Sequence, residues 1–149
     1  MKVKYYLTSS GRSPIEELIA PLFDLYRQFY GQVGDLEAAK CFLKERLLNN
    51  ESVIFYARDA DIVIGFVQLY PSFSSVSMKR LWILNDLFVN PEARRQTAGR
   101  KLLEKATAYA AETKAKGLTL KTAIDNSSAQ RLYESLGWKR DDRFISYFI

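Results

Sequence analysis

Two neighbouring β-rich runs in the middle of the chain restrict its fold more than any other feature. Val53 to Arg58 and Ile62 to Tyr70 are rich in β-branched and aromatic residues, and only Asp59-Ala60-Asp61 separates them. Such a short gap predicts an antiparallel hairpin. Leu81 to Val89 predicts a third strand, and residues 71–77 before it predict a loop.

Helical periodicity flanks these strands on both sides in the sequence. Apolar residues at three- and four-residue spacing predict one helix from Ser13 to about Gly31 and a second from Asp35 to Leu48. After the strands, the pattern predicts a helix that Gly117 ends and a short helix that Asn126 caps. This order of elements over residues 1–149 predicts a single α+β domain with a mixed sheet.

Two further strands are expected in the second half of the chain, at Leu118 to Thr122 and at Phe144 to Ile149. Cys41 is the only cysteine, and its helical position beside Phe42 predicts a small buried side chain. No run approaches the roughly 18 apolar residues of a membrane span, and the start lacks the apolar stretch of a secretory signal. We therefore expect a cytoplasmic protein without a membrane partner.

The chain contains no histidine, and this excludes several classes of catalytic site. Ser-His-Asp catalysis, Cys-His catalysis and histidine-based zinc sites are ruled out, and no metal is expected. Any proton transfer must use Tyr, Asp, Glu, Lys or water. The net charge of +5 favours an anionic ligand but does not distinguish a nucleotide cofactor from a nucleic acid.

A turn of basic and small residues, Arg94 to Arg100, follows the third strand and precedes a helix. The first amides of a helix lack internal partners, and its dipole favours negative charge there. A phosphate or pyrophosphate would bind amides around Thr97 to Gly99, with the arginines nearby as charged donors. From the local pattern alone, the arginines could equally coat a helix start with solvated charge.

This turn resembles the acetyl-CoA-binding motif of the GCN5-related N-acetyltransferase (GNAT) superfamily. The family pattern is Gln/Arg, two residues, Gly, one residue, Gly/Ala, and its three defining positions fall on Arg94, Thr97 and Gly99. The stretch from Asn126 to Trp138 is similar to a second family signature, with an Asn, a Leu-Tyr-Glu and a Gly-aromatic pair. The resemblance implies a twisted, mixed and mostly antiparallel sheet flanked by helices on both faces.

The resemblance also implies which residues bind acetyl-CoA as cosubstrate. Residues of the third strand would contact its pantetheine arm, and residues of the turn would hold its pyrophosphate: Leu87, Phe88, Val89, Arg94, Arg95, Gln96, Thr97, Ala98, Gly99 and Arg100. Asn126, Ala129 and Tyr133 would lie beside the cofactor arm. Thr97 departs from the family pattern, because a β-branched residue adopts a positive φ only at a cost.

Tyr133 and Asp86 are the candidate catalytic residues. The resemblance implies that Tyr133 faces the thioester sulfur, where a phenol of pKa about 10 can protonate the departing thiolate. Its helical spacing alone is equally that of a core residue. Asn85 and Asp86 interrupt an apolar strand, which predicts a bulge, a buried hydrogen-bond network, or a group that orients an ammonium and relays its proton.

The acceptor side resembles two groups within the superfamily. Leu84 to Val89 is similar to a segment of spermidine/spermine acetyltransferases, and Tyr70 to Ser77 with the Trp82 strand is similar to bacterial relatives of Hpa-type acetyltransferases. Asn85, Asp86, Tyr70 and Trp82 are therefore the candidate substrate-binding residues, and aromatic faces among them could hold a cation.

Together these features predict an N-acetyltransferase that moves acetyl from acetyl-CoA to a primary amine of a small molecule or peptide. Direct attack is favoured, because the only thiol, Cys41, has no histidine to activate it. The family often self-associates, so a homodimer is expected. A CoA-binding module without turnover is the first alternative. A nucleic-acid-binding domain is the second, and the scattered basic residues argue against a nucleic-acid partner.

Overall fold

The computed structural model describes residues 2–6, 15–93 and 97–149. Its five-stranded sheet has the order β1-β2-β3-β4-β5. The strands are β1 (Lys2–Tyr6), β2 (Val53–Asp59), β3 (Ile62–Ser74), β4 (Lys79–Val89) and β5 (Leu118–Thr119). Neighbours from β1 to β4 pair antiparallel, whereas β5 pairs parallel with β4. The predicted mixed, mostly antiparallel sheet is confirmed, and β1 is a strand that the sequence analysis missed.

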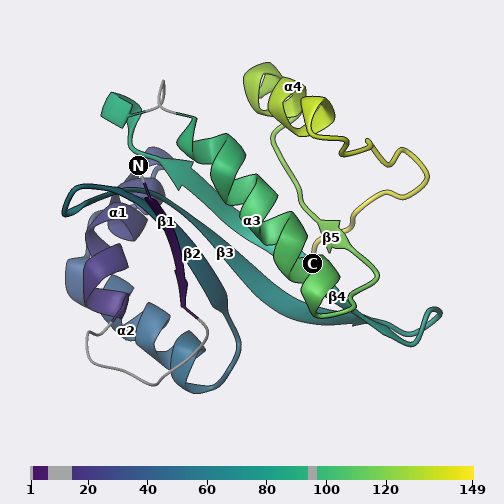
Figure 1. The fold of residues 1–149 in the computed structure, drawn as a ribbon, viewed down its shortest axis with the longest axis horizontal. Coiled ribbons are helices and arrows are strands. Elements are labelled where there is room, and N and C mark those ends of the chain that lie inside the picture. The colour runs from purple at the N-terminus through teal and green to yellow at the C-terminus, as the bar shows by residue number, and fades with distance from the viewer. Residues whose placement is uncertain (1, 7–14, 94–96) are drawn as a thin grey trace.

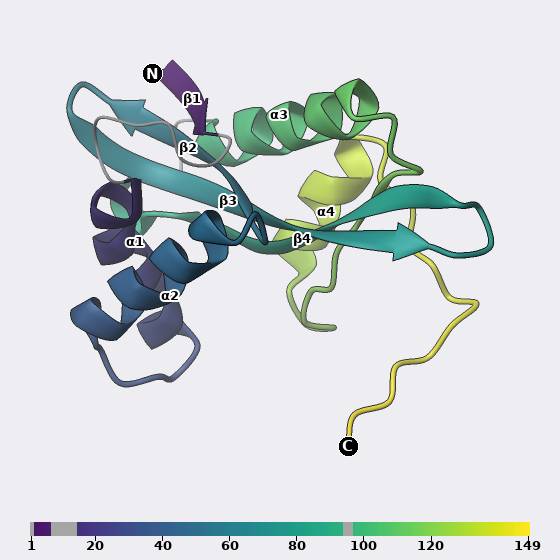
Figure 2. The ribbon, with the colours of Figure 1, turned by 90° about the horizontal axis from the view of Figure 1, so that it is seen from below.

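Helices cover both faces of this sheet (Figure 1). They are α1 (Ile15–Phe29), α2 (Leu36–Leu48), α3 (Ala98–Glu112) and α4 (Ser127–Ser135), and a short 3-10 helix, η1 (Pro91–Ala93), leads from β4 toward α3. Figure 2 shows α1 and α2 on one face and α3 on the other. Each face has its own apolar core, one built on α1 and α2 and one on α3, and side chains of α4 pack against the second core. None of the described helices is long and apolar enough to span a membrane.

Side-chain caps fix the starts of α2 and α4 as the sequence predicts. The Asp35 carboxylate accepts a hydrogen bond from the Ala38 amide at 3.1 Å, and the Asn126 side chain accepts one from the Ala129 amide at 3.3 Å. These bonds satisfy amides that have no partner within the helix. Beyond the end of α4, Gly137 has the positive φ of +89° that favours glycine.

The prediction of a buried Cys41 is wrong, because Cys41 is exposed on α2. The residues of α2 that are buried are Ala39, Leu43 and Leu47, which recur every four positions. Cys41 lies about 160–200° around the helix from Ala39 and Leu43, given about 100° per residue, and so faces outward. Its neighbour Phe42 is half-exposed and stacks on Phe23 of α1 with ring centroids 5.9 Å apart.

The predicted loop at residues 71–77 is wrong in its first half, because β3 continues to Ser74 and Pro71 pairs with Trp82 of β4. The β2–β3 register ends at Leu69, so Pro71 needs no donor toward β2. The structure also corrects the predicted end of α3 at Gly117. This helix ends at Glu112, and the Thr113 hydroxyl donates to the Tyr109 carbonyl at 2.9 Å.

The two strands predicted in the second half of the chain form only in part. Of Leu118 to Thr122, only Leu118–Thr119 is a strand, and Phe144 to Ile149 is not a strand. Both segments have β-prone sequences, but no described strand pairs with residues 120–122 or with residues 144–149.

Gly65 of β3 sits where α3 crosses the sheet, and it leaves no room for a side chain. A Cβ there would lie 3.1 Å from the Phe88 carbonyl oxygen, 3.2 Å from a Val89 methyl and 3.3 Å from a Leu102 methyl. We expect Gly65→Ala to lower the free energy of unfolding by about 1–3 kcal/mol through overpacking. Gly117→Ala is the control, because no atom lies within 4 Å of its Cβ position. Equal denaturant midpoints for the two variants would contradict this account.

Candidate functional site

A cleft of about 830 Å³ opens where β4 and β5 separate. The two strands pair only at Trp82–Leu118 and Ile83–Thr119. Beyond these pairs, β4 continues to Val89, while the chain after β5 continues through residues 120–123 toward α4. Residues from β4, from this segment, from α1, from the start of α3 and from α4 line the cleft.

The N-termini of two helices contribute to the cleft. Thr97, Gly99 and Arg100 line it from the start of α3, and Asn126, Ser128 and Ala129 line it from the start of α4. The Arg100 guanidinium donates to the Ser135 hydroxyl at 3.4 Å, which links the two helices. Amide donors, helix dipoles and the charges of Arg100 and Lys121 together fit an anionic ligand. Arg94, Arg95 and Gln96, also candidates for this site, lie outside the described residues.

Thr97 adopts the left-handed conformation, with φ of 60° and ψ of 9°, immediately before α3. Its side chain makes no capping hydrogen bond to the helix. A β-branched residue in this conformation is strained, since its Cβ approaches the neighbouring backbone. The backbone at position 97 therefore has the left-handed conformation that glycine adopts most readily, and this is the position where the motif described above usually has glycine.

Tyr133 of α4 is half-buried and lines the cleft. Burial is the main cause that raises the pKa of its phenol, and Tyr30 of α1 adds a smaller effect in the same direction. The phenol therefore stays protonated at neutral pH and can donate a proton. Its ring packs near Trp138, with centroids 6.0 Å apart.

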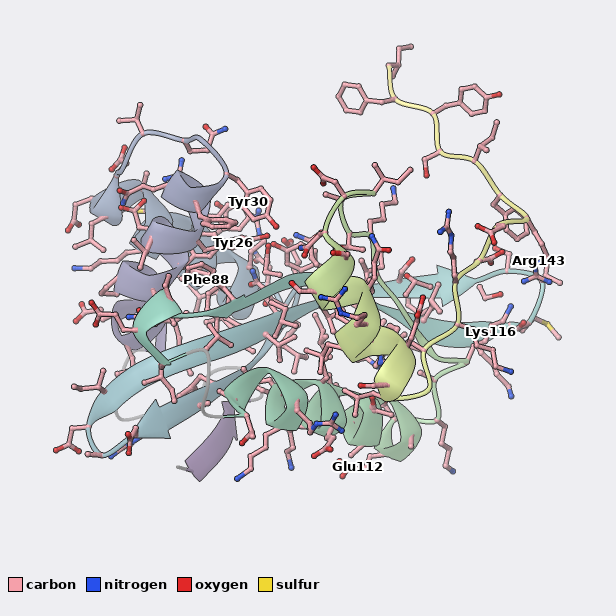
Figure 3. All side chains as sticks on the ribbon, turned by 90° about the horizontal axis from the view of Figure 1, so that it is seen from above. Tyr26, Tyr30, Phe88, Glu112, Lys116 and Arg143 are labelled. Carbon is pink, nitrogen blue, oxygen red and sulfur yellow. The ribbon has the colours of Figure 1, made fainter. Side chains whose placement is uncertain are left out.

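An aromatic wall of Tyr26, Phe29 and Tyr30 from α1, together with Phe88 of β4, faces the cleft. The rings contact one another, with centroids 5.1 Å apart for Tyr26–Tyr30 and 5.7 Å for Tyr26–Phe88. Figure 3 shows Tyr26 and Tyr30 extending from α1, with Phe88 close to Tyr26. The sequence pattern did not single out Tyr26 and Tyr30, which belong to the helical spacing that predicts α1. Two phenols one turn apart near the end of that helix were the available signal.

A β-bulge at Asn85 determines where Asp86 points. Gln68 of β3 pairs with Asp86 and Leu69 pairs with Leu84, so Asn85 is an extra residue in β4. An extra residue turns the following side chains to the opposite face of the sheet. Leu84 and Leu87 thus both pack in the α3 core, while Asp86 turns toward α1 and Asn85 lines the cleft.

Asp86 belongs to a buried polar network directly behind the cleft. It accepts hydrogen bonds from the Gln68 amide at 2.7 Å, from the Asn85 amide at 3.1 Å and from the Tyr26 phenol. The Ser52 hydroxyl donates to the Gln68 carbonyl oxygen at 2.6 Å. The structure thus has both the bulge and the buried network that the polar pair predicts.

The environment of Asp86 favours its neutral form more than water does. Burial raises the pKa of the carboxyl above its ordinary value, and the donors Gln68, Tyr26 and Asn85 oppose this rise only in part. Burial and the nearby Asp86 also raise the pKa of the Tyr26 phenol. Because Tyr26 and Asn85 line the cleft and Asp86 does not, any proton reaching Asp86 must pass through one of them or through water.

Three other candidate residues lie outside the cleft lining. Ala98 is buried in the α3 core. Trp82 is buried in the same core, and its indole donates to the Thr113 hydroxyl at 2.9 Å. The Tyr70 hydroxyl accepts from the Gln68 amide at 3.2 Å, which places it in the network behind the cleft. The remaining described candidates, Leu87, Phe88, Val89, Gly99, Asn126 and Ala129 among them, do line the cleft. Within the described ranges, no group of three His, Cys, Asp or Glu side chains could hold a metal ion.

Comparison with known proteins identifies the fold and family. Residues 19–138 match the model of the Acetyltransferase (GNAT) family. The chain is 55% identical over 129 residues to "Uncharacterized N-acetyltransferase YhfO" of Bacillus subtilis, covering 87% of each chain. It is 37% identical over 124 residues to a "Probable acetyltransferase" of Haemophilus influenzae, covering 83% of each. A crystal structure of a probable acetyltransferase superposes with a TM-score of 0.90 at 43% identity, covering 100% of this chain and 97% of that one.

The backbone strain at Thr97 should be visible in the free energy of unfolding when Thr97 is replaced by glycine. Thr97→Gly removes the strain of a positive φ, roughly 1–2 kcal/mol, and adds roughly 0.5–1 kcal/mol of backbone entropy cost. We therefore expect the free energy of unfolding to stay the same or rise by up to about 1.5 kcal/mol. Thr97→Val keeps the branched shape and should not gain stability. Urea unfolding checks both variants, and a clear loss of stability in Thr97→Gly would contradict the strained conformation.

Proposed function

Because the chain belongs to the acetyltransferase (GNAT) family, we propose that it transfers acetyl from acetyl-CoA to a primary amine within the cleft between β4 and β5. The observation that carries the proposal is the convergence of two helix N-termini, a protonated phenol and a buried carboxylate network on this one cleft. The helix N-termini suit an anionic cosubstrate. The phenol suits the donation of a proton, and the carboxylate suits the acceptance of one.

The cleft contains the groups that acetyl-CoA requires. Amides at Thr97 to Arg100 and the Arg100 guanidinium would hold its pyrophosphate, while β4 from Leu87 to Val89 and α4 at Asn126 and Ala129 would border its pantetheine arm. Bound acetyl-CoA supplies an activated acetyl thioester. A backbone amide of β4 at Leu87 would donate to the thioester carbonyl as negative charge develops on its oxygen.

Acetyl transfer needs one residue to take a proton from the amine and another to give a proton to the departing thiolate. An alkyl ammonium has a pKa of about 10.4, so it must lose a proton before its nitrogen can attack the thioester carbon. Asp86 would take that proton through the Tyr26 phenol or through water, because Tyr26 reaches both the cleft and the carboxylate. As the nitrogen–carbon bond forms and the carbon–sulfur bond breaks, the Tyr133 phenol would protonate the departing thiolate.

The cleft also indicates the character of the amine. Tyr26, Phe29, Tyr30 and Phe88 form an aromatic wall in front of the Asp86 network. Aromatic faces attract cations and pack against apolar skeletons. The proposed acceptor is therefore a cationic primary amine on a largely apolar carbon skeleton. Tyr70 and Trp82, on which the resemblance to Hpa-type enzymes depends in part, do not contribute to this wall.

Removing the Tyr133 hydroxyl tests both the reaction and its acid. The wild-type protein is incubated with acetyl-CoA and a panel of primary amines, thiol release is recorded, and mass spectrometry locates the transferred acetyl group. With a verified acceptor, Tyr133→Phe should lower kcat by about 10²–10⁴-fold and leave acetyl-CoA affinity nearly unchanged, since the proton matters only as the thiolate departs.

Tyr109→Phe is the matched control for this variant. Tyr109 is a phenol on α3 in the core and does not line the cleft, so its loss should leave kcat within a few-fold of wild type. Wild-type kcat in Tyr133→Phe would show that Tyr133 is a packing residue. Binding of acetyl-CoA without thiol release for any amine would instead favour a CoA-binding module.

The pH profile tests the role of Asp86. If its carboxylate takes the proton of the amine, kcat/KM rises as pH increases through its pKa, which burial raises above the ordinary value. Tyr26→Phe removes a donor that stabilises the carboxylate, so the acidic limb should move to higher pH. Tyr70→Phe is the control, because the Tyr70 hydroxyl accepts from Gln68 and does not donate to Asp86. Identical limbs in wild type and Tyr26→Phe would contradict the role.

A further inference from the structure

A buried chain of hydrogen bonds runs from Ser52 through Gln68 to the carboxylate of Asp86. The Ser52 hydroxyl donates to the Gln68 carbonyl oxygen at 2.6 Å, and the Gln68 amide nitrogen donates to Asp86 at 2.7 Å. Ser52 is 2% exposed and Gln68 is 0% exposed, and neither residue is among those that line the cleft. The proposed acetyl transfer uses Asp86 but gives Ser52 and Gln68 no part.

Gln68 is the donor that most favours the ionised form of Asp86. Burial raises the pKa of the Asp86 carboxyl, and among the hydrogen bonds that oppose this rise the one from Gln68 has the largest effect. Its length of 2.7 Å is typical of a bond to a charged acceptor. An amide donates from its nitrogen and accepts at its oxygen, so this bond requires the Gln68 nitrogen to face Asp86. The orientation of the Gln68 amide therefore decides how well the ionised carboxylate is stabilised.

Ser52 holds the opposite end of the Gln68 amide. Because the Ser52 hydroxyl donates to the Gln68 oxygen, the amide hydrogens are directed to Asp86 and to the Tyr70 hydroxyl, which accepts at 3.2 Å. Donation to the oxygen also polarises the amide and strengthens the bonds that its nitrogen donates. With the oxygen turned toward Asp86 instead, two buried acceptors would face each other, which is costly.

The backbone sets the position of Ser52 independently of Gln68. Ser52 lies in the short connection between the end of α2 at Leu48 and the start of β2 at Val53. The amide of its neighbour Glu51 donates to a carbonyl in the last turn of α2 at 2.8 Å, and β2 then pairs with the strand that carries Gln68. The serine is therefore fixed by backbone contacts, and the flexible glutamine side chain is the part that adjusts.

We infer that Ser52 is a positioning residue for Asp86, the proton acceptor of the proposed reaction: Ser52 orients the Gln68 amide, which in turn holds the ionised carboxylate. This role rests on the proposed function, because it gives Ser52 a part in the removal of a proton from the amine. Ser52 contacts neither the amine nor acetyl-CoA, and its effect passes through Gln68. Loss of the Ser52 hydroxyl should therefore change the pH at which Asp86 ionises rather than the maximal rate.

The other titratable groups around Asp86 keep a constant charge while Asp86 ionises. Burial and the nearby Asp86 raise the pKa of Tyr26 on α1 and of Tyr70 on β3, so both phenols remain neutral. Tyr30 of α1 adds a smaller effect on Tyr26. Arg46 of α2 acts on Tyr70 and carries a constant positive charge. A shift of the acidic titration in this network therefore reports Asp86 itself.

The ionisation of Asp86 can be measured by NMR without turnover. Protein labelled at the aspartate side-chain carboxyls is titrated in the absence of acetyl-CoA and amine, and the Asp86 resonance is identified by its loss in Asp86→Asn. We expect Ser52→Ala to move the midpoint of this resonance to higher pH, because the Gln68 bond to the carboxylate weakens. Gln68→Met keeps an unbranched side chain but has no donor, so it should move the midpoint further.

The double variant shows whether Ser52 acts through Gln68. Once Gln68→Met has removed the amide, Ser52→Ala should have no further effect, and the double variant should titrate with the midpoint of Gln68→Met alone. A direct effect of Ser52 on the carboxylate would instead add to that of Gln68→Met. Additive shifts would therefore overturn the inference, as would a midpoint in Ser52→Ala equal to that of wild type.

Thr113→Val is the matched control for the loss of a hydroxyl with a side-chain partner. The Thr113 hydroxyl accepts from the Trp82 indole at 2.9 Å, and Trp82 packs in the α3 core on the other face of the sheet. Urea unfolding should show that Thr113→Val and Ser52→Ala are both folded, and only Ser52→Ala should move the Asp86 midpoint. An equal shift in both variants would attribute it to a general loss of packing and would overturn the inference.

Turnover provides the second test, with a verified amine acceptor. On the acidic limb, kcat/KM of Ser52→Ala should fall by about two- to tenfold, as expected for the loss of one hydrogen bond. At high pH, where Asp86 is ionised in both proteins, kcat/KM should match that of wild type.

The two measurements separate the role of Ser52 from the proposed function. An NMR midpoint that moves in Ser52→Ala, with no change in the acidic limb of kcat/KM, would support the positioning of Asp86 by Ser52 and overturn the role of Asp86 in acetyl transfer. An NMR midpoint that does not move would overturn the positioning role even where acetyl transfer itself is confirmed.

Discussion

The parallel pairing of β4 with β5 stops after Trp82 and Ile83, and the candidate site depends on that early end. A longer ladder would close the space into which β4, the start of α3 and α4 now present their polar groups. The two strands diverge while the apolar cores on both faces of the sheet remain packed. Backbone geometry creates the space before any side chain contributes chemistry.

The bulge at Asn85 adds the second constraint. In a regular strand of the same sequence, Asp86 would lie two residues after Leu84 and share its face, and so would enter the apolar α3 core, where an unpaired carboxylate is costly. With the bulge, Asp86 lies under Tyr26 and is bonded to Gln68. Burial raises the pKa of its carboxyl, and the hydrogen bonds offset that rise only in part. The bulge thus places Asn85 in the lining of the cleft and Asp86 in the polar network behind it.

The sequence allowed prediction of features that depend on local chemistry. The caps at Asp35 and Asn126, the central hairpin and the alternatives for Asp86 all follow from residue types at short spacing. Contacts between distant segments could not be predicted. The aromatic wall on α1 looked like core, because periodicity identifies an apolar face but not the edge where that face meets a cleft. The prediction of Trp82 near the acceptor was wrong. Its indole donates to the Thr113 hydroxyl just beyond the end of α3, and the sequence pattern did not predict where α3 ends.

The central claim is that the space between the diverging strands β4 and β5 is the cosubstrate site. Amide hydrogen exchange with and without acetyl-CoA tests this claim most directly. Binding should slow exchange at Leu84 to Val89, at residues 97–100 and from Leu120 to Ala129, the segments that line the cleft, because bound ligand removes their amides from water. The β1–β2 edge and the β3–β4 turn should exchange as before. Protection confined to those outer regions, or no protection at saturating acetyl-CoA, would contradict the account.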